Sequence, residues 1–245
     1  MSTDPRPPNL SLNPDARINV SRFGAEGQPL IVVDDVLLHP DEMYDYAVQS
    51  GRFTDPPEGS FYPGRNGVLP AAYGQTLCTA LRPFLERVFG LPGHMALSYE
   101  GFFGIACQPP ETLHPLQTIP HFDSANPQRI AGVHYLCRPP YRGTAFYRHV
   151  ATGYESIHGP RVEPYRRAVF AELETAGQAL PGHVEGDIAG FERIETVEMA
   201  FNRLVLYRTT SLHAGLLGTT RLGRTPEDGR LTANSFIEAV RSKRF

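Results

Sequence analysis

The chain has 245 residues, 41% of them hydrophobic, which is enough for one large β domain with a sizeable core and excludes wholesale disorder. The formal net charge of −3 comes without a long basic run, which argues against nucleic acid as the main partner. The three cysteines form no Cys-x-x-Cys pair, and we find neither an apolar run long enough for a membrane span nor a signal-peptide pattern. We therefore expect a cytoplasmic protein without a membrane partner.

The N-terminal part of the chain mixes predicted strands with predicted helices. β-Branched residues predict strands at residues 16–21 and 29–34. Pro40 is followed by carboxylates, a pattern typical of the first turn of an amphipathic helix. The Pro- and Gly-rich stretch 54–74 is expected to be irregular, and apolar residues at helical spacing predict a second helix at 75–89.

From residue 96 onward the pattern is strongly that of β structure. Gly, Pro and Asn separate the apolar segments, as antiparallel sheets require. The predicted strands cover residues 96–107, 130–137, 144–148, 204–207 and 231–240. A charged helix predicted at 161–176 should pack outside the sheet. The expected fold class is mainly β, with helices flanking the sheet on the N-terminal side.

We expect one domain spanning residues 1–245. Residues 1–15 are polar and Pro-rich and are predicted to form a flexible arm. Residues 149–200 are long for a link between core strands, so we interpret them as an insertion. The insertion could cover the mouth of a pocket and set specificity, or it could be purely structural. The oligomeric state has no signal in the sequence.

A His-x-Asp pair, His121 and Asp123, is the first candidate for chemistry. In an extended segment the side chains alternate between faces, so these two point the same way and Phe122 points the opposite way. Two ligands spaced in this way can hold one metal ion from one side. Alone the pair is a weak signal, because His-x-Asp occurs often by chance.

The second candidate is His213, which follows an apolar strand and a short polar turn. Two histidines and one carboxylate leave three positions open on an octahedral Fe(II), which suits O2 and a bidentate co-substrate. A partly buried structural histidine is the alternative interpretation of this residue on its own.

The third candidate is the pair Arg230 and Thr232, which share one face of the last predicted strand. A guanidinium fork with a neighbouring hydroxyl suits a buried carboxylate, because charge-assisted hydrogen bonds offset the cost of desolvation. An exposed arginine at the start of a strand is the alternative.

The order and spacing of these segments resemble the prolyl-4-hydroxylase-like branch of the 2-oxoglutarate/Fe(II)-dependent dioxygenase superfamily. As in that branch, an Arg-led strand ending in Tyr135 and Leu136 follows the His-x-Asp pair, and a turn containing Gly143 precedes an aromatic strand. The resemblance extends over roughly residues 29–240. Only the blocks 121–148 and 203–237 are specific.

The resemblance implies a double-stranded β-helix (a cupin-like jelly roll) and an Fe(II) ion held by His121, Asp123 and His213. The implied activity is oxidation of a substrate with O2 and 2-oxoglutarate, most commonly hydroxylation. A small metabolite, an amino acid or a peptidyl side chain all remain open as substrate.

The resemblance also implies how 2-oxoglutarate is held: Arg230 would bind its distal carboxylate, and Thr232 and Tyr135 would add hydroxyl contacts. Because a polar loop lengthens the distance from the distal histidine to Arg230, Arg221 or Arg224 could be the carboxylate partner instead.

Two other functions remain open on the sequence. One is a metal-dependent cupin-like enzyme that uses no 2-oxoglutarate. The other is a non-catalytic sensor that binds iron or 2-oxoglutarate.

Overall fold

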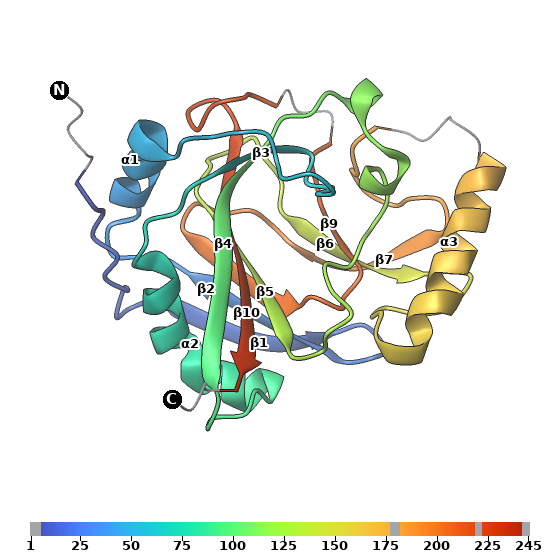
Figure 1. Cartoon of the computed structure of the whole chain (residues 1–245), viewed down its shortest axis with the longest axis horizontal. Helices are drawn as coiled ribbons and strands as arrows, with labels where there is room; N and C mark the ends of the chain where they lie inside the picture. Colours follow the sequence, from blue (N-terminus) through green and yellow to red (C-terminus); the bar gives the residue numbers. More distant parts are fainter. Residues whose placement is uncertain (1–5, 177–181, 219–221, 242–245) are drawn as a thin grey trace.

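Two antiparallel sheets make up most of the molecule (Figure 1). The computed structural model describes residues 6–176, 182–218 and 222–241. The larger sheet contains β1 (Arg17–Phe23), β2 (Gln28–Asp34), β3 (Gly64–Gly67), β4 (Ala96–Ala106), β5 (Arg129–Tyr135), β8 (Arg203–Arg208) and β10 (Arg230–Val240). Its strand order is β1-β2-β8-β5-β10-β4-β3. The smaller sheet contains β6 (Thr144–His149), β7 (Phe191–Val197) and β9 (His213–Gly215), in the order β7-β6-β9.

In the described part of the chain, three helices flank the sheets. They are α1 (Pro40–Ser50), α2 (Tyr73–Phe89) and α3 (Val162–Ala176), with short 3-10 turns at η1 (Pro110–Thr112), η2 (Pro115–Gln117) and η3 (Gly159–Arg161). The helix α1 begins at its proline, which is pre-shaped for the first turn. The helix α2 ends at Gly90, which adopts a left-handed conformation with a φ of 71°.

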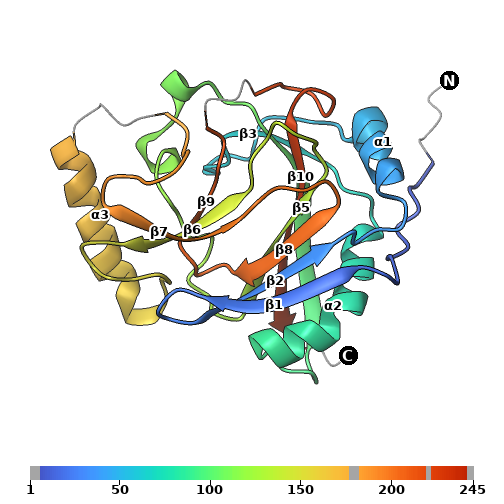
Figure 2. The same cartoon turned by 180° about the vertical axis from the view of Figure 1, so that it is seen from behind.

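The elements form four layers. The helices α1 and α2 pack on one face of the larger sheet through one apolar core. The opposite face of that sheet packs on the smaller sheet through a second core, and α3 covers the far side of the smaller sheet through a third. Figures 1 and 2 show this arrangement, with α1 and α2 at one end of the molecule and α3 at the other.

Strand alternation decides which side chains face the space between the sheets. In β5, Ile130 and His134 lie on the helix side, whereas Ala131 and Tyr135 lie on the side of the smaller sheet. In β10, Leu231, Ala233 and Ile237 belong to the helix-side core. The residues that alternate with them therefore face the smaller sheet.

The predictions of a mainly β, antiparallel fold with flanking helices are confirmed, and the predicted helices and long strands are present within a few residues of the expected bounds. Three strands were not predicted. The stretch 54–74, expected to be irregular, contains β3, which pairs with β4. The strand β9 has only three residues, and the apolar residues of β7 are three apart in the chain, not two as in a regular alternating strand. Long-range pairing, rather than local propensity, makes these segments extended.

Part of the predicted flexible arm lies against the body of the protein. Leu12 forms a bridge with Leu37, and the Leu38 amide donates to the Ser11 carbonyl at 2.9 Å. Leu10 is buried in the helix-side core. Apolar side chains in this otherwise polar segment account for the anchoring.

Residues 149–200, interpreted as an insertion, contain both α3 and β7. Because β7 pairs with β6, the last part of this segment is a strand of the smaller sheet. No helix in the described part of the chain is both long and apolar enough to cross a membrane.

Candidate metal centre

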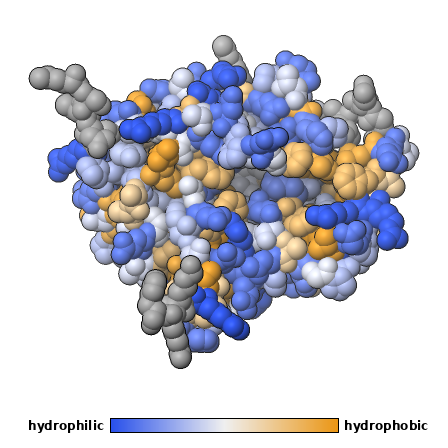
Figure 3. Space-filling view, in the orientation of Figure 1, coloured by the Kyte–Doolittle hydropathy of each residue, from blue (hydrophilic) through white to orange (hydrophobic). Residues whose placement is uncertain are grey.

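A cavity of about 590 Å³ lies between the two sheets and extends to the inner side of α3. Its walls come from β4, β5 and β10 of the larger sheet, from β6 and β9 of the smaller sheet, and from the segments 59–63 and 116–123. This volume is in the range of pockets that hold small molecules. Figure 3 shows hydrophobic residues gathered on the α3 side of this face of the molecule, on the right of the view.

His121 and His213 are brought together by backbone pairing. The His121 amide donates to the His213 carbonyl at 2.9 Å, and the His213 amide donates to the His121 carbonyl at 2.8 Å. Residues that exchange both hydrogen bonds lie directly opposite each other and share a face of the ladder. Their ring centroids are accordingly 4.4 Å apart.

Asp123 completes the cluster from two residues further along the same segment. Its carboxylate oxygens lie 3.6 Å from His121 Nε2 and 3.6 Å from His213 Nε2. One ligand atom from each of the three residues lies within 4.8 Å of the others. The structure thus brings together the three predicted ligands, and three such atoms around one point can hold a metal ion.

The His213 ring is oriented by its neighbours. Its Nδ1 donates to the Ser211 carbonyl at 2.9 Å, and Tyr207 packs on it with the ring centroids 4.7 Å apart. Because a carbonyl only accepts, Nδ1 carries the proton, and in the neutral ring Nε2 keeps its lone pair toward Asp123. This is the tautomer that a metal ligand requires.

The surroundings keep the two imidazoles of the cluster in their metal-binding, neutral state at pH 7. Desolvation lowers the pKa of His213 to about 4, and desolvation followed by repulsion from His213 lowers the pKa of His121 to about 4. Desolvation raises the pKa of Asp123, opposed by His121 and Arg129. The two imidazoles are therefore neutral at pH 7.

Arg230 lies further along the same cavity wall and is buried, with a relative exposure of 6%. Its Nε donates to the Arg142 carbonyl at 3.1 Å, and its NH2 donates to the Gly143 carbonyl at 3.0 Å. The guanidinium carbon lies 5.3 Å from the centroid of the Tyr135 ring. Among the residues that the structure describes, no carboxylate forms an ion pair with Arg230. A buried cation with free donors toward a cavity favours an anionic ligand.

Thr232 lies on the cavity wall beside Arg230, as predicted, and accepts a hydrogen bond from Asn234 Nδ2 at 3.1 Å. Tyr135 lies beneath that wall. It is fully buried, and its hydroxyl is hydrogen-bonded to Thr144 Oγ1 at 2.7 Å. At this point Thr144, and not Tyr135, lines the cavity.

Sequence reasoning missed Tyr62, which lies in the segment predicted to be irregular. Tyr62 lines the cavity, and its hydroxyl is buried and has no hydrogen-bond partner among the described residues. Burial raises its pKa to about 12, and the charge on Arg230 opposes this shift. Gly104 makes room for it, because a Cβ there would lie 2.3 Å from the Tyr62 hydroxyl. No local pattern marks Tyr62, which reaches the site through the pairing of β3 with β4.

Of the two alternative carboxylate partners, the structure describes only Arg224. Arg224 is exposed and does not line the cavity. Arg221 lies outside the described residues. His134 packs on the helix side of the sheet against Tyr73, as expected for a core residue. Of the other histidines in the described residues, His183 also lines the cavity, but it is not part of the cluster.

The fold and the site together define the class of protein: an antiparallel two-sheet protein with a two-histidine, one-carboxylate cluster in the cavity between its sheets. A family model described as a family of unknown function (DUF6445) matches residues 14–237, and the chain belongs to this family. A comparison with curated proteins finds no match.

Proposed function

We propose that this protein is an Fe(II)- and 2-oxoglutarate-dependent dioxygenase that hydroxylates its substrate. The observation that carries the proposal is the placement of His121, Asp123 and His213 in one cavity with the unpaired guanidinium of Arg230. The cluster alone suits several metal ions, and the buried arginine adds the requirement for an anionic co-substrate.

The donor set fits Fe(II). Two neutral imidazoles and one carboxylate on one side of the ion are the ligands of non-haem iron oxygenases, and they leave positions open. His121, Asp123 and His213 would hold the ion, which would supply O2 activation coupled to decarboxylation of 2-oxoglutarate to succinate. The Ser211 carbonyl would hold His213 in the ligand tautomer.

The part of the cavity wall around Arg230 fits 2-oxoglutarate. Gly215 is two residues beyond His213 on β9, and a Cβ at Gly215 would lie 3.8 Å from the Arg230 guanidinium. Roughly 7 Å of strand separates His213 from Gly215, the residue beside the guanidinium, and this length is comparable with that of a five-carbon dicarboxylate. Arg230 would bind the distal carboxylate, with the hydroxyls of Thr232 and Tyr62 beside it.

The remaining residues of the site would orient the reactants and exclude water. The carbonyls of Arg142 and Gly143 hold the guanidinium from behind, so its free donors point to the cavity. Phe146 and Tyr207 pack around His213, and both are fully or almost fully buried. A pre-oriented guanidinium strengthens electrostatic contacts with the co-substrate.

For the fold of this class we propose the double-stranded β-helix, or jelly roll. The antiparallel pairing of every strand in two facing sheets supports it, as does the position of the cavity between them. The pairing of His121 with His213 adds a further extended segment beside β9. We also propose that the protein acts in the cytoplasm on a small-molecule or peptidyl substrate.

The test is anaerobic titration of the Fe(II)-loaded protein with 2-oxoglutarate, followed by the weak visible charge-transfer band of bidentate chelation. The wild type should show the band. His213→Ala should lose Fe(II) binding with its circular dichroism unchanged, because one of three ligands is gone. His94→Ala, a control at an exposed histidine, should behave as the wild type.

The other outcomes separate the alternatives. Iron binding without the band would refute the use of 2-oxoglutarate and favour a cupin-like enzyme of another chemistry. A band without succinate release under any condition would favour a non-catalytic sensor. Undiminished iron binding by His213→Ala would refute the metal site itself.

A further inference from the structure

We propose that the outer part of the cavity binds an uncharged, apolar group of the substrate, either aromatic or branched aliphatic. We call this part the outer wall and define it as Phe61, Phe122, Tyr165, Val169 and Phe170, all of which line the cavity. The proposal names the substrate class of the proposed dioxygenase and therefore rests on that function.

The outer wall lines the same cavity as the metal ligands. Tyr165 of α3 packs edge-on against Phe122, with the ring centroids 5.9 Å apart, and its hydroxyl donates to the Pro120 carbonyl at 3.4 Å. Phe122 stands between His121 and Asp123 in the chain. Because the ligands and these α3 residues line the same cavity, a group held against α3 shares that cavity with the three metal ligands.

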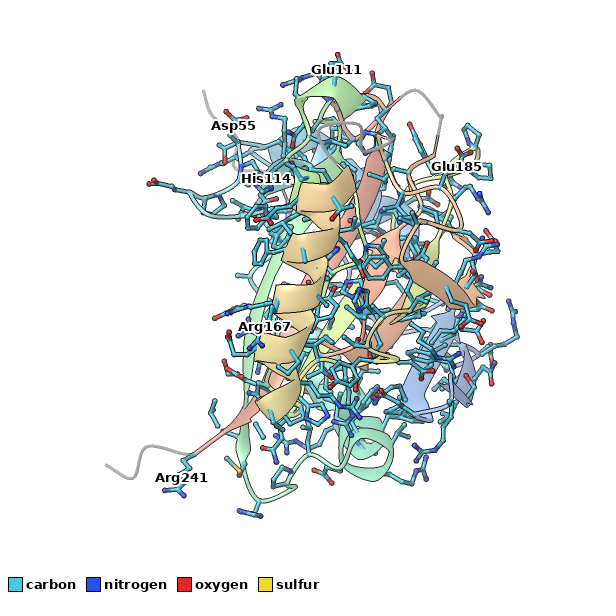
Figure 4. All side chains as sticks on the ribbon, turned by 90° about the vertical axis from the view of Figure 1, so that its right-hand side faces the viewer. Asp55, Glu111, His114, Arg167, Glu185 and Arg241 are labelled. Atoms are coloured by element: carbon cyan, nitrogen blue, oxygen red, sulfur yellow. The ribbon has the colours of Figure 1, made fainter. Side chains whose placement is uncertain are left out.

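The helix that carries the wall is held firmly on the smaller sheet. His149 of β6 is fully buried and contacts Glu172 of α3, with Nε2 and Oε2 3.1 Å apart. Tyr165 and Val169 belong to the core between α3 and that sheet. Figure 4 looks onto the outer side of α3, where Arg167 lies. The wall is therefore a pre-formed surface, as pockets for small molecules usually are.

Two aromatic rings of the wall are exposed to solvent. Phe61 is 52% exposed and Phe170 is 51% exposed, and they belong to the few large hydrophobic residues with such exposure in the described chain. Exposed apolar side chains that converge on one cavity mark a binding surface, because a ligand can remove them from water.

The charges around the cavity exclude a cationic group. Among the described residues that line it, Asp123 is the only carboxylate, and in the proposed enzyme it binds the metal. Arg230 supplies positive charge to the same walls, whereas Arg166 is paired with Glu163 at 3.5 Å. An amine or guanidinium of a substrate would lose part of its hydration on entering the cavity without gaining an anionic partner, which is unfavourable. An uncharged apolar group meets no such cost.

The test uses two probes with the same apolar body, 3-phenylpropan-1-ol and 3-phenylpropan-1-amine, and measures their binding to the full chain by ligand-observed NMR. The wild type should bind the alcohol at least tenfold more tightly than the amine. Phe170→Glu places a carboxylate on the wall and should weaken the alcohol at least tenfold while improving the amine. Phe61→Ser, on the opposite rim, should also weaken the alcohol.

The matched control is Ala171→Glu, which adds the same charge at the next residue of α3, outside the cavity lining and exposed. It should leave both affinities unchanged. Equal affinity for the two probes in the wild type would overturn the proposal, as would equal effects of Phe170→Glu and Ala171→Glu.

The same variants are titrated with Fe(II) and 2-oxoglutarate, which should bind Phe170→Glu as they bind the wild type. Absence of the charge-transfer band in the wild type would refute the proposed function. The preference for the alcohol over the amine is measured separately, so it would still test the outer wall. A normal band without any preference would refute the outer wall alone.

Discussion

At the scale of single residues, Arg230 shows how burial turns a side chain into a binding group. Two of its donors are satisfied by the carbonyls of Arg142 and Gly143, and its face is covered by Tyr135. The remaining donors face the cavity without an anionic partner among the described residues. A guanidinium in this position is costly unless a ligand supplies the charge.

Replacement of this arginine should therefore cost affinity for the co-substrate. We expect Arg230→Ala to weaken 2-oxoglutarate by about 2–4 kcal/mol, or roughly 30- to 700-fold, because it leaves a buried carboxylate unpaired. Isothermal titration of the Fe(II)-loaded protein under anaerobic conditions measures this. Arg224→Ala, at an exposed position, should have no effect. If Arg230→Ala bound 2-oxoglutarate normally, the carboxylate partner would have to be another residue.

At the scale of elements, the turn before β8 ties the larger sheet to the segment between β2 and α1. Asn202 has a φ of 64° and is buried. Its Oδ1 accepts from the Leu37 amide at 3.0 Å, and its Nδ2 donates to the Leu37 carbonyl at 2.9 Å. Asparagine suits this position because it tolerates the left-handed conformation and pairs with backbone groups.

Removal of the Asn202 side chain should destabilise the protein. We expect Asn202→Ala to lower the free energy of unfolding by about 3 kcal/mol, because buried backbone groups lose their partners and alanine is strained at a positive φ. Urea unfolding followed by circular dichroism measures this change. Asn19→Ala, at an exposed position on β1, should change it by less than about 0.5 kcal/mol. Equal effects of the two substitutions would contradict the anchoring role.

At the scale of the whole molecule, the helix-side core contains a neutral histidine. His134 is fully buried, its Nδ1 is 2.9 Å from the Tyr73 hydroxyl, and its Nε2 is 3.2 Å from Asn202 Oδ1. Desolvation lowers its pKa to about 4, opposed by the hydrogen bond to Asn202. The folded protein thus resists protonation at this position more than the unfolded chain does.

Stability should consequently fall as the pH is lowered from about 6.5 towards about 4. In this window the unfolded chain binds a proton at His134 and the folded protein does not, so each step to lower pH favours unfolding. His134 alone should account for about 3 kcal/mol. Urea unfolding of the metal-free protein between pH 7.5 and 4.5 measures the slope, which should be shallower in His134→Gln. An identical slope in both proteins would show that His134 does not contribute.

Local sequence patterns were sufficient to predict the main helices and strands and two pairs of site residues that each share a face. The β-branched segments form β1 and β2, and strand alternation alone predicts that His121 and Asp123 share one face. Arg230 and Thr232 share a face for the same reason. These features depend on neighbours within a few residues, which the order of amino acids specifies directly.

Contacts between distant segments decided the rest. The pairing of His121 with His213 closes the cluster, the pairing of β3 with β4 brings Tyr62 to the cavity, and the turn of Tyr135 toward Thr144 removes its hydroxyl from the wall. The outer wall exists only because α3 docks on the smaller sheet. Such contacts minimise the free energy of the whole core rather than of any one segment, so no local pattern contains them.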